Sequence, residues 1–464
     1  MSYERYDAGL LSPPVSLLSD VPNTHWTALS HPLHPGYGVR VRKTAFCDNN
    51  VNGYTGYIDI QARHLFFYFF ESRNDPDNDD VILWTNGGPG GSSSIGLFFE
   101  LGPCRIPDAN GPKFHPESWN TNANIIFIDQ PIGVGFSYAE FGETVFTTEE
   151  AATDIVAFLA IFFDNFVQFK ARPLHLAGES YGGRYIPLFG SAVYDQNARR
   201  VEAGLAPLNL TSVMIGNGMT DRIGTILSYY DMQCTPVSLQ PFVDITSCVH
   251  LKQMLDRCHR WMTRACDDHF DHIDCNAAWT YCSDTFTAPI LQTNRNSYDM
   301  SKTCDGIFEE TLCYPDTAYI RDYLSQPVNQ ALLGVDPAVR GNFSFVSWPV
   351  NTGFTVAGDH LHLTTYYVAA LLERGVRVLI YVGTYDLVCN HVGNERWTLA
   401  LDWSGKQDYG MAEKHEWFVD KKRAGQTRSA RGLTFATVEG AGHMVQKITN
   451  GTVKVLILSA GSLR

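Results

Sequence analysis

Short apolar runs that end at glycine-rich or polar turns are the dominant pattern of this chain. Such runs are typical of strands buried in a parallel sheet. They lie at Val81–Thr85, Asn124–Asp129, Pro173–Ala177, Ser212–Ile215 and Val376–Val382. Between the second and third runs, Glu149–Phe169 has the apolar period of a helix, and Thr147 and Glu150 have the spacing of a capping box at its start. The order strand, helix, strand predicts a doubly wound α/β fold.

The stretch 221–358 differs from the rest of the chain. It has clustered cysteines, many histidines and aspartates, and no regular spacing of apolar runs, so we interpret it as an insertion. Residues 1–46 are rich in proline and histidine, and we interpret them as an arm or the remnant of a pro-segment. The expected organisation is therefore an arm (1–46), an α/β core in two parts (47–220 and 359–464) and an inserted disulfide-rich subdomain (221–358).

Composition excludes several classes of protein. With 464 residues, of which 44% are hydrophobic and 18% charged, the chain has enough apolar material for a large core. A formal charge of -14 without a long basic run argues against nucleic acid or an anionic membrane as partner. The longest nearly apolar run, Ile155–Phe163, is far shorter than the roughly 20 residues that a membrane-spanning helix needs.

The cysteines point to an oxidising compartment. Six of the eleven lie between Cys234 and Cys282 without a Cys-x-x-Cys pair, which favours disulfides over a zinc site. Glycosylation sequons begin at Asn209, Asn342 and Asn450. Together these features favour the secretory pathway, with a vacuolar or extracellular destination. Residues 1–20 do not have the pattern of a signal peptide, so we expect the signal to lie on a segment missing from this sequence.

A candidate nucleophile follows the third predicted strand. Gly178-Glu-Ser180-Tyr-Gly182 lies between that strand and a predicted helix. In this context G-x-S-x-G is a nucleophile elbow, a strained turn that small residues permit and that exposes the serine hydroxyl. Ser180 is therefore the expected nucleophile.

A serine hydroxyl needs a histidine to take its proton and an acid to orient that histidine. The elbow predicts the chain order serine, acid, histidine. Asp386 follows the strand Val376–Val382, and His443 lies on a glycine-rich loop after the run Leu433–Val438. Taken alone, Asp386 is better explained as a turn residue and His443 as one of fifteen ordinary histidines. The three residues in the required order favour a catalytic triad, which needs neither a metal nor another cofactor.

Acyl transfer also requires N–H donors for the developing oxyanion. The run from Asn86 to Gly91, directly after Val81–Thr85, leaves backbone N–H groups uncovered by side chains. The alternative is a phosphate-binding loop, but the Lys-Ser/Thr ending of such a loop is missing.

These motifs closely resemble one family, the serine carboxypeptidases, which include vacuolar enzymes of the yeast type. The resemblance extends from about Tyr54 to Val445 and implies an α/β-hydrolase fold and removal of C-terminal residues from peptides or proteins with a free C-terminus. The matching blocks are Trp84-Thr-Asn-Gly-Gly-Pro-Gly90, Gly96-Leu-Phe-Phe-Glu-Leu-Gly-Pro103, Asp129-Gln-Pro, Gly133-x-Gly-Phe-Ser-Tyr138, Gly178-Glu-Ser-Tyr-Gly182, Ile215-Gly-Asn-Gly218, Asp386-x-x-Cys-Asn390 and Gly442-His-Met444.

The resemblance implies roles for further residues. Gly88 and Tyr181 would supply the oxyanion-hole N–H groups, and the substrate carboxylate would be held by Asn86, Gly87, Glu100 and Glu179. Two close carboxyl groups do not both ionise cheaply, so one keeps a proton and can donate a hydrogen bond to an anion. We therefore expect hydrolysis to be best in acid. From the sequence alone, a surface charge on a helix is the favoured explanation of Glu100.

The resemblance also implies a pocket for the departing residue. By similarity it would be lined by Tyr298, Tyr314 and Met444, with Trp84 and the unpaired thiol of Cys389 close by. An aromatic lining favours bulky hydrophobic terminal residues. Tyr298 and Tyr314 are equally well explained as packing residues.

The resemblance also implies disulfide pairs, and the chain departs from the family at two places. The implied pairs are Cys234–Cys248, Cys258–Cys282, Cys266–Cys275 and Cys304–Cys313, which leaves Cys47 and Cys104 to bond to each other. A further family disulfide is lost, because Gly91 and, by alignment, Gly341 occupy its positions. After Val445 the family continues with a proline and a closing helix, whereas Gln446–Arg464 matches neither.

Two other functions remain open at this stage. A carboxypeptidase-like acyltransferase would pass the acyl group to an alcohol or amine, but the presence of both Glu100 and Glu179 favours peptide substrates. A non-catalytic secreted scaffold would explain the unusual tail but not the intact triad.

Overall fold

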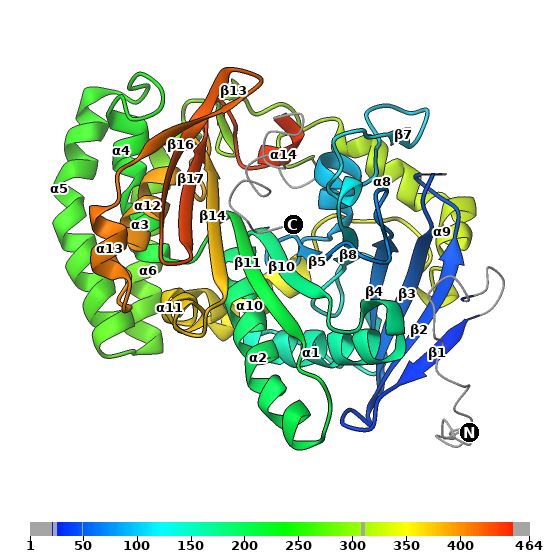
Figure 1. The fold of residues 1–464 in the computed structure, drawn as a ribbon. Helices are drawn as coiled ribbons and strands as arrows, with labels where there is room; N and C mark the ends of the chain where they lie inside the picture. Colours follow the sequence, from blue (N-terminus) through cyan, green and yellow to red (C-terminus); the bar gives the residue numbers. More distant parts are fainter. Residues whose placement is uncertain (1–20, 22–25, 49, 308–310, 449–464) are drawn as a thin grey trace.

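A mixed sheet runs through the molecule (Figure 1). The computed structural model describes residue 21 and residues 26–48, 50–307 and 311–448. Within them the sheet has 13 strands in the order β1-β2-β3-β4-β8-β5-β10-β11-β14-β17-β16-β15, with β9 paired to β4. The strands are β1 (Thr27–Ser30), β2 (Tyr37–Thr44), β3 (Gly53–Ile60), β4 (Arg63–Phe70), β5 (Val81–Thr85), β8 (Asn124–Ile128), β9 (Tyr138–Ala139), β10 (Pro173–Ser180), β11 (Asn209–Gly218), β14 (Arg377–Gly383), β15 (His415–Val419), β16 (Lys422–Ala430) and β17 (Leu433–Val438).

The centre of the sheet is parallel and its two edges are antiparallel. β8, β5, β10, β11, β14 and β17 run parallel to one another. Antiparallel pairings add β1–β4 and β9 on one side and β16 and β15 on the other. The central strands are buried on both faces, which explains their continuous apolar sequences.

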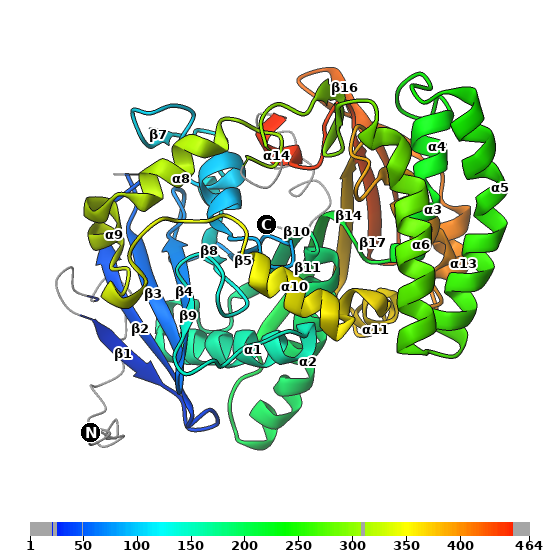
Figure 2. The same ribbon diagram turned by 180° about the vertical axis from the view of Figure 1, so that it is seen from behind.

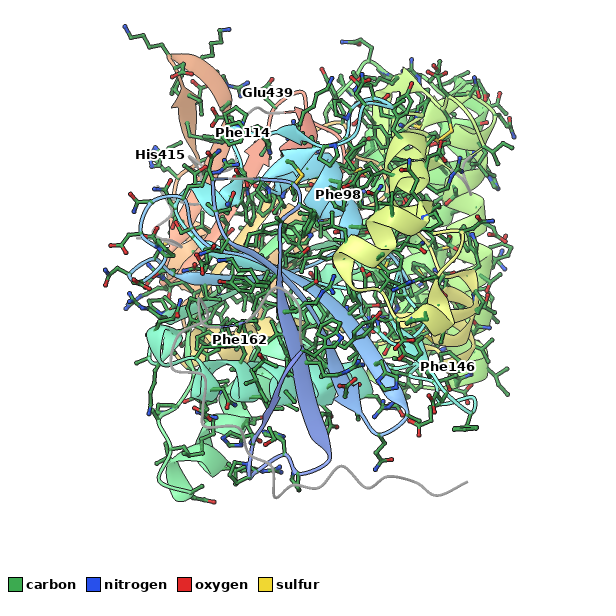
Figure 3. All side chains as sticks on the ribbon, turned by 90° about the vertical axis from the view of Figure 1, so that its right-hand side faces the viewer. Phe98, Phe114, Phe146, Phe162, His415 and Glu439 are labelled. Atoms are coloured by element: carbon green, nitrogen blue, oxygen red, sulfur yellow. A yellow bond between two sulfur atoms is a disulfide. The ribbon has the colours of Figure 1, made fainter. Side chains whose placement is uncertain are left out.

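Helices cover both faces of the sheet. One apolar layer includes Val81 and Leu83, and the other includes Ile82 and Trp84, so successive residues of β5 serve opposite faces. Phe162 belongs to the first layer and Phe98 to the second (Figure 3). The first layer receives residues from α1 (Thr148–Asn165), α2 (Gly182–Glu202), α10 (Trp348–Ala357), α11 (Thr365–Glu373), α12 (His391–Ala400) and α13 (Lys406–Met411). The second receives residues from the π-helix η2 (Gly96–Leu101), α8 (Thr317–Ser325), α9 (Pro327–Leu333) and α14 (Val445–Ile448).

A third apolar cluster lies in a separate helical group. Its helices pack beside α12 at the end of the molecule opposite β1 (Figures 1 and 2). They are α3 (Arg222–Leu227), α4 (Tyr229–Cys234), α5 (Ile245–Met262), η5 (Thr263–Asp268) and α6 (His272–Leu291). A hairpin of β12 (Arg295–Asn296) and β13 (Asp299–Thr303) follows. In the described part of 221–358 no strand joins the central sheet; only an isolated bridge from Val346 reaches Gly91.

The remaining elements are short. They are β6 (Cys104–Arg105), β7 (Lys113–Phe114), η3 (Trp119–Thr121), η4 (Val167–Phe169), η6 (Pro337–Val339) and η7 (Asp359–Leu361). Among the helices that the structure describes, none combines the length and the apolar character needed to cross a membrane.

The disulfides are the pairs that the sequence led us to expect. They are Cys47–Cys104, Cys234–Cys248, Cys258–Cys282, Cys266–Cys275 and Cys304–Cys313, and Cys389 is a buried free thiol.

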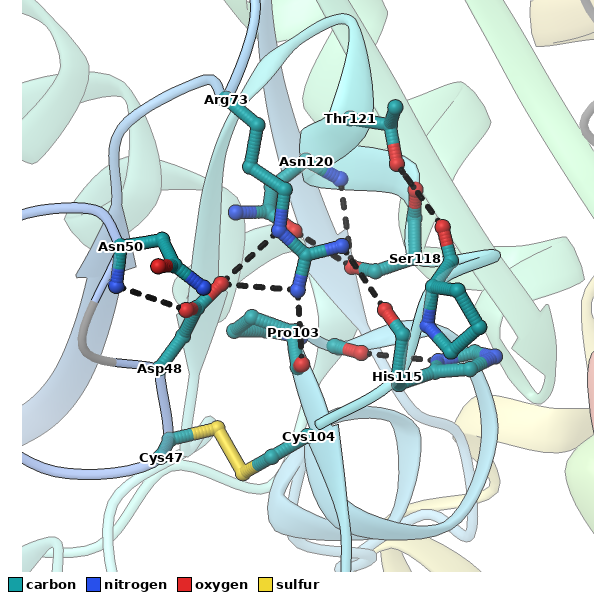
Figure 4. A network of polar contacts seen from close by, with 12 residues as sticks. Cys47, Asp48, Asn50, Arg73, Pro103, Cys104, His115, Ser118, Asn120 and Thr121 are labelled. Carbon is teal, nitrogen blue, oxygen red and sulfur yellow. Dashed lines mark hydrogen bonds and ion pairs between the residues drawn. A yellow bond between two sulfur atoms is a disulfide. The ribbon is translucent and has the colours of Figure 1, made fainter. Parts of the chain in front are cut away.

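Beside the first disulfide, Arg73 joins three segments (Figure 4). Its guanidinium donates to Asp48 Oδ2 at 2.8 Å, to the His115 carbonyl at 2.7 Å and to the Pro103 carbonyl at 2.9 Å. The chain before β3 is thus fixed to the loop that follows η2.

The predicted elements agree with the structure at the centre of the sheet and differ at its edge. Val81–Thr85 and Leu433–Val438 have the observed bounds, and the Thr147 side chain accepts from Glu150 N at the start of α1. Residues 27–30 and 37–44, which we had interpreted as part of an arm, form β1 and β2 of the sheet. In β2, Val39 and Val41 are buried while the alternate arginines are only half-buried, so the strand lacks a continuous apolar run.

The two halves of the core meet at the buried carboxylate of Asp359. It accepts from Thr148 N at 2.8 Å, from Tyr181 Oη at 2.5 Å and from Arg184 Nε at 3.0 Å. Both charged side chains are almost fully buried, at 2% exposed for Arg184 and 1% for Asp359. Removing one partner of such a pair leaves a buried charge uncompensated.

We expect Asp359→Asn to lower the free energy of unfolding by about 3–5 kcal/mol, because Arg184 would remain buried without its counter-charge. Urea unfolding followed by circular dichroism measures this. The control is Asp408→Asn, which breaks an ion pair whose side chains are 45% and 68% exposed; it should cost less than about 1 kcal/mol. Equal losses of unfolding free energy in the two variants would contradict the role of Asp359 as the buried counter-charge of Arg184.

Candidate active site

The predicted site residues follow the carboxyl ends of neighbouring parallel strands. Asn86 follows β5, Ser180 ends β10, Asp386 lies shortly after β14, and His443 lies on the loop after β17. These strands are adjacent in the order β5-β10-β11-β14-β17. The carboxyl ends of parallel strands lie together on one side of the sheet, where open α/β sheets bind their ligands.

Ser180 has the strained backbone of a nucleophile elbow. Its φ is +61°, which is unusual for a residue with a side chain, and α2 begins two residues later. The turn requires small neighbours: a Cβ on Gly178 would lie 2.8 Å from the Thr85 carbonyl oxygen, and one on Gly183 would lie 2.5 Å from Met219 N. The local sequence therefore places Ser180 in a sharp turn at the carboxyl end of the central strand β10.

His443 and Asp386 form a buried pair. His443 Nδ1 lies 2.8 Å from Asp386 Oδ2, and the two residues are 2% and 0% exposed. The His443 backbone N–H donates to the Tyr298 carbonyl at 2.7 Å, and the Tyr298 ring lies 4.7 Å from the imidazole. Within the described residues, no hydrogen bond joins Ser180 Oγ to His443. Such bonds are often long in enzymes without substrate.

Two glutamates are buried beside Ser180. Glu179 immediately precedes it, and Glu100 comes from η2; they are 3% and 0% exposed. Burial raises the pKa of Glu100 to about 7. Burial, together with the charge of Glu100, raises the pKa of Glu179 well above its ordinary value. Each Oε2 atom has no donor within the described part of the chain. Glu100 is therefore not a surface charge, and the pair favours its protonated, hydrogen-bond-donating form.

The Asn86 amide faces both glutamates. Its Nδ2 lies 3.0 Å from Glu179 Oε1 and 3.5 Å from Glu100 Oε1. Its Oδ1 accepts from Trp84 Nε1 at 2.8 Å and from Gly96 N at 3.0 Å. Because two donors occupy the oxygen end, the nitrogen end must point to the carboxyl groups.

The glycine-rich loop approaches Ser180 closely. A Cβ on Gly87 would lie 2.3 Å from Tyr181 N and 2.8 Å from Ser180 Cβ, so only glycine fits. Gly88 has a φ of +116°, in the region that favours glycine. The loop after β5 and the N–H of Tyr181 therefore lie together beside Ser180.

Residues 345–351 hold this loop from the other side. Ser92 N donates to the Phe345 carbonyl at 2.8 Å, and Ser347 N donates to the Gly90 carbonyl at 2.9 Å. Between these bonds Gly91 pairs with Val346. Backbone hydrogen bonds on both sides of Gly91 therefore join the loop to residues 345–347.

The expected pocket residues have different environments. Tyr298 lies against His443, and the Tyr314 ring lies 5.6 Å from Phe99. Met444 is buried, and burial raises the pKa of the Cys389 thiol. Trp84 is fully buried; its contacts are with Asn86 and, edge to face, with Trp119.

Possible ligand atoms of Asp386, Cys389 and His443 lie within 4.8 Å of one another. A metal ion there would compete with the hydrogen bond between Asp386 and His443. Of the three sequon asparagines, Asn209 and Asn342 are exposed, and Asn450 lies outside the described residues.

Two further polar residues were not singled out from the sequence. Asn217 Nδ2 donates to Asp386 Oδ2 at 2.7 Å; the Ile215–Gly218 block was noted, but without a role for this side chain. Gln446, the first residue of the unusual tail, donates to Tyr381 Oη at 2.5 Å, and its carbonyl accepts from Arg105 at 2.9 Å. Arg105 also donates to the Glu100 carbonyl. The first residues of the tail therefore pack against the segment that carries Glu100.

Comparison with known proteins gives one consistent result. Residues 45–457 match the family model described as serine carboxypeptidase. The chain is 39% identical over 415 residues to carboxypeptidase Y of Komagataella phaffii, covering 88% of this chain and 76% of that protein. It is also 39% identical over 415 residues to carboxypeptidase Y of Candida albicans, covering 89% and 74%. The solved structure of Kex1(delta)p, a prohormone-processing carboxypeptidase from Saccharomyces cerevisiae, shares the fold with a TM-score of 0.76 at 24% identity, covering 90% of this chain and 95% of that one. The chain has the α/β-hydrolase fold and belongs to the serine carboxypeptidase family.

Proposed function

We propose that this enzyme removes single residues from the free carboxyl ends of peptides through an acyl-enzyme on Ser180, and that it does so best in acid. The observation that carries the proposal is the buried group of Asn86, Glu100 and Glu179 directly beside Ser180. An esterase or lipase has no need of hydrogen-bond donors for a carboxylate at this place. The same group favours peptide hydrolysis over acyl transfer to an alcohol.

The contact between His443 and Asp386 supports a catalytic triad with Ser180. Neutral His443 takes the proton of Ser180 as Oγ attacks the scissile carbonyl carbon, and the N–H groups of Gly88 and Tyr181 stabilise the resulting oxyanion. The imidazolium gives its proton to the departing nitrogen, the C–N bond breaks, and the terminal residue leaves. Water then attacks the ester, its proton passes to His443, and the shortened peptide is released with Ser180 restored.

Binding of the substrate carboxylate depends on the glutamate pair. In acid the pair keeps its protons, so neutral carboxyl groups and the Asn86 amide can donate to the anion. The backbone N–H of Gly87 adds a further donor. When the pair ionises, negative charge faces the substrate carboxylate and repels it.

We also propose that the enzyme functions in the secretory pathway. Its five disulfides need an oxidising compartment to form and persist. The exposed sequon residues Asn209 and Asn342 support the same location.

The first test uses two peptides that differ only in a free or amidated C-terminus, followed by mass spectrometry at mildly acidic pH. We expect stepwise shortening of the free-ended peptide alone, because only this peptide offers a carboxylate to the glutamate pair. Ser180→Ala should lower the rate by at least about 10⁴-fold, since it removes the nucleophile. A folded wild-type enzyme that shortens neither peptide, or both equally, would contradict the proposal.

The second test concerns pH. As the pH rises through about 7, Glu100 ionises, so we expect the KM for a free-ended peptide to rise by up to about tenfold per pH unit. Glu100→Gln replaces the titrating group with a permanent amide donor, so its KM should change little between about pH 6 and pH 8. The control Glu439→Gln changes a half-exposed glutamate outside the site and should keep the wild-type pH dependence. A wild-type KM that stays constant across this range would count against the role of the pair.

A further inference from the structure

Asn217 has an unusual position at the end of β11. It lies where the pairing with β10 changes register, between Gly216, opposite Glu179, and Gly218, opposite Ser180. Its side chain is fully buried and its φ is +42°, a conformation that few residues with a side chain adopt. Irregularities of this kind turn a side chain in a new direction and concentrate beside functional sites.

Both ends of the Asn217 amide are engaged by the segment after β14. Its Oδ1 accepts from Gly383 N at 3.2 Å, and its Nδ2 donates to Asp386 Oδ2 at 2.7 Å. Because an N–H donor faces the oxygen end, the orientation of the amide is fixed by its partners. Asn217 therefore connects the strand beside Ser180 to the turn that carries Asp386.

Three N–H donors converge on one oxygen of Asp386. Oδ2 is contacted by His443 Nδ1 at 2.8 Å, Asn217 Nδ2 at 2.7 Å and Cys389 N at 3.2 Å. The other oxygen, Oδ1, is buried and has no partner among the described residues. The carboxyl torsion of an aspartate is broad, so its plane must be fixed by hydrogen bonds.

These donors are not equivalent. Cys389 belongs to the same turn as Asp386 and moves with it, and the imidazole of His443 is the group that has to be oriented. Asn217 supplies the one donor from the central sheet among the described residues, and it thereby fixes the carboxylate relative to the strand that carries Ser180.

We propose that Asn217 is a positioning residue for the reaction, which directs the Asp386 carboxylate at His443 through a charge-assisted hydrogen bond. The inference rests on the proposed function. Without the donor the carboxylate can rotate, and His443 is held less firmly when it takes and returns the proton. Asn217 makes no hydrogen bond to Asn86, Glu100 or Glu179 in the described structure, so substrate binding should be preserved.

The test compares wild type, Asn217→Ala and Asn217→Gly. Glycine tolerates the positive φ, so Asn217→Gly removes the amide without adding backbone strain. For a free-ended peptide we expect kcat to fall roughly 10- to 100-fold with KM within about threefold, the effect of losing one hydrogen bond to a charged group. The rate at which a fluorophosphonate labels Ser180 should fall by a similar factor, because labelling needs the triad but not the carboxylate site.

A matched control separates positioning from stability. Asn124 is also fully buried; its Oδ1 accepts from Ser72 N, and its Nδ2 donates to two carbonyl oxygens. Asn124→Ala should lower the melting temperature but leave kcat within about twofold, since Asn124 begins β8 at the end of the parallel strands opposite the triad and its side-chain hydrogen bonds go to Ser72, Pro76 and Asp79. If Asn217→Ala does not fold, kcat and KM are compared between wild type and Asn217→Gly alone.

A further measurement does not use activity. The proton between His443 Nδ1 and Asp386 should give a low-field nuclear magnetic resonance signal in the wild type that shifts or broadens in Asn217→Gly. A folded Asn217→Gly enzyme with kcat within twofold of wild type and an unchanged signal would overturn the inference. Absence of labelling and hydrolysis in the wild type would instead reject the proposed function.

Discussion

Burial of three carboxyl groups is the constraint on which the active site depends. Glu100, Glu179 and Asp386 are all nearly inaccessible to solvent, and an isolated buried carboxylate costs several kcal/mol or more. The fold meets this cost in two ways. Asp386 receives three N–H donors on one oxygen, which stabilise its charge for the pairing with His443. The two glutamates receive one shared amide, so burial raises their pKa values and favours neutral groups that can donate to an anion. In the proposed mechanism these neighbouring acids have different roles: Asp386 orients His443, and the glutamates donate to the substrate carboxylate.

Two asparagine side chains, Asn86 and Asn217, contact these buried carboxyl groups in a fixed orientation. In each side chain, backbone or indole N–H groups donate to the amide oxygen. The amide nitrogen is therefore the end that faces a carboxyl group. Asn86 faces the glutamates and Asn217 faces Asp386. Asn86 follows β5 and Asn217 lies at the end of β11, the two strands on either side of β10, so the sheet fixes the backbone at both positions. An amide is well suited to this position, because it stays uncharged across the pH range in which the glutamates titrate.

The sequence alone predicts an element correctly where residues close together in the chain determine its structure. The sequence predicts the exact bounds of β5, because its residues are apolar and buried on both faces. It also predicts the sharp turn at Ser180, because the neighbouring backbone leaves room only for glycine at Gly178 and Gly183. The edge strand β2 was missed because its charged residues alternate with buried valines and are held by long-range partners such as Asp59. The contact of Asn217 was missed for a different reason: it exists only because β11 lies beside β14, a neighbour relation that the chain order alone does not give.

The loop beside Ser180 is held by backbone contacts at the place where the family resemblance implies a disulfide that this chain lacks. A disulfide stabilises mainly by restricting the unfolded chain, by about 2–4 kcal/mol, whereas the position of a folded loop is set by its local contacts. Here Gly91 pairs with Val346, with backbone hydrogen bonds on both sides. Each such bond contributes about 1 kcal/mol and holds the backbone at a defined distance. We therefore expect the missing crosslink to affect the stability of the fold more than the position of the loop, so that the backbone N–H groups beside Ser180 stay in place.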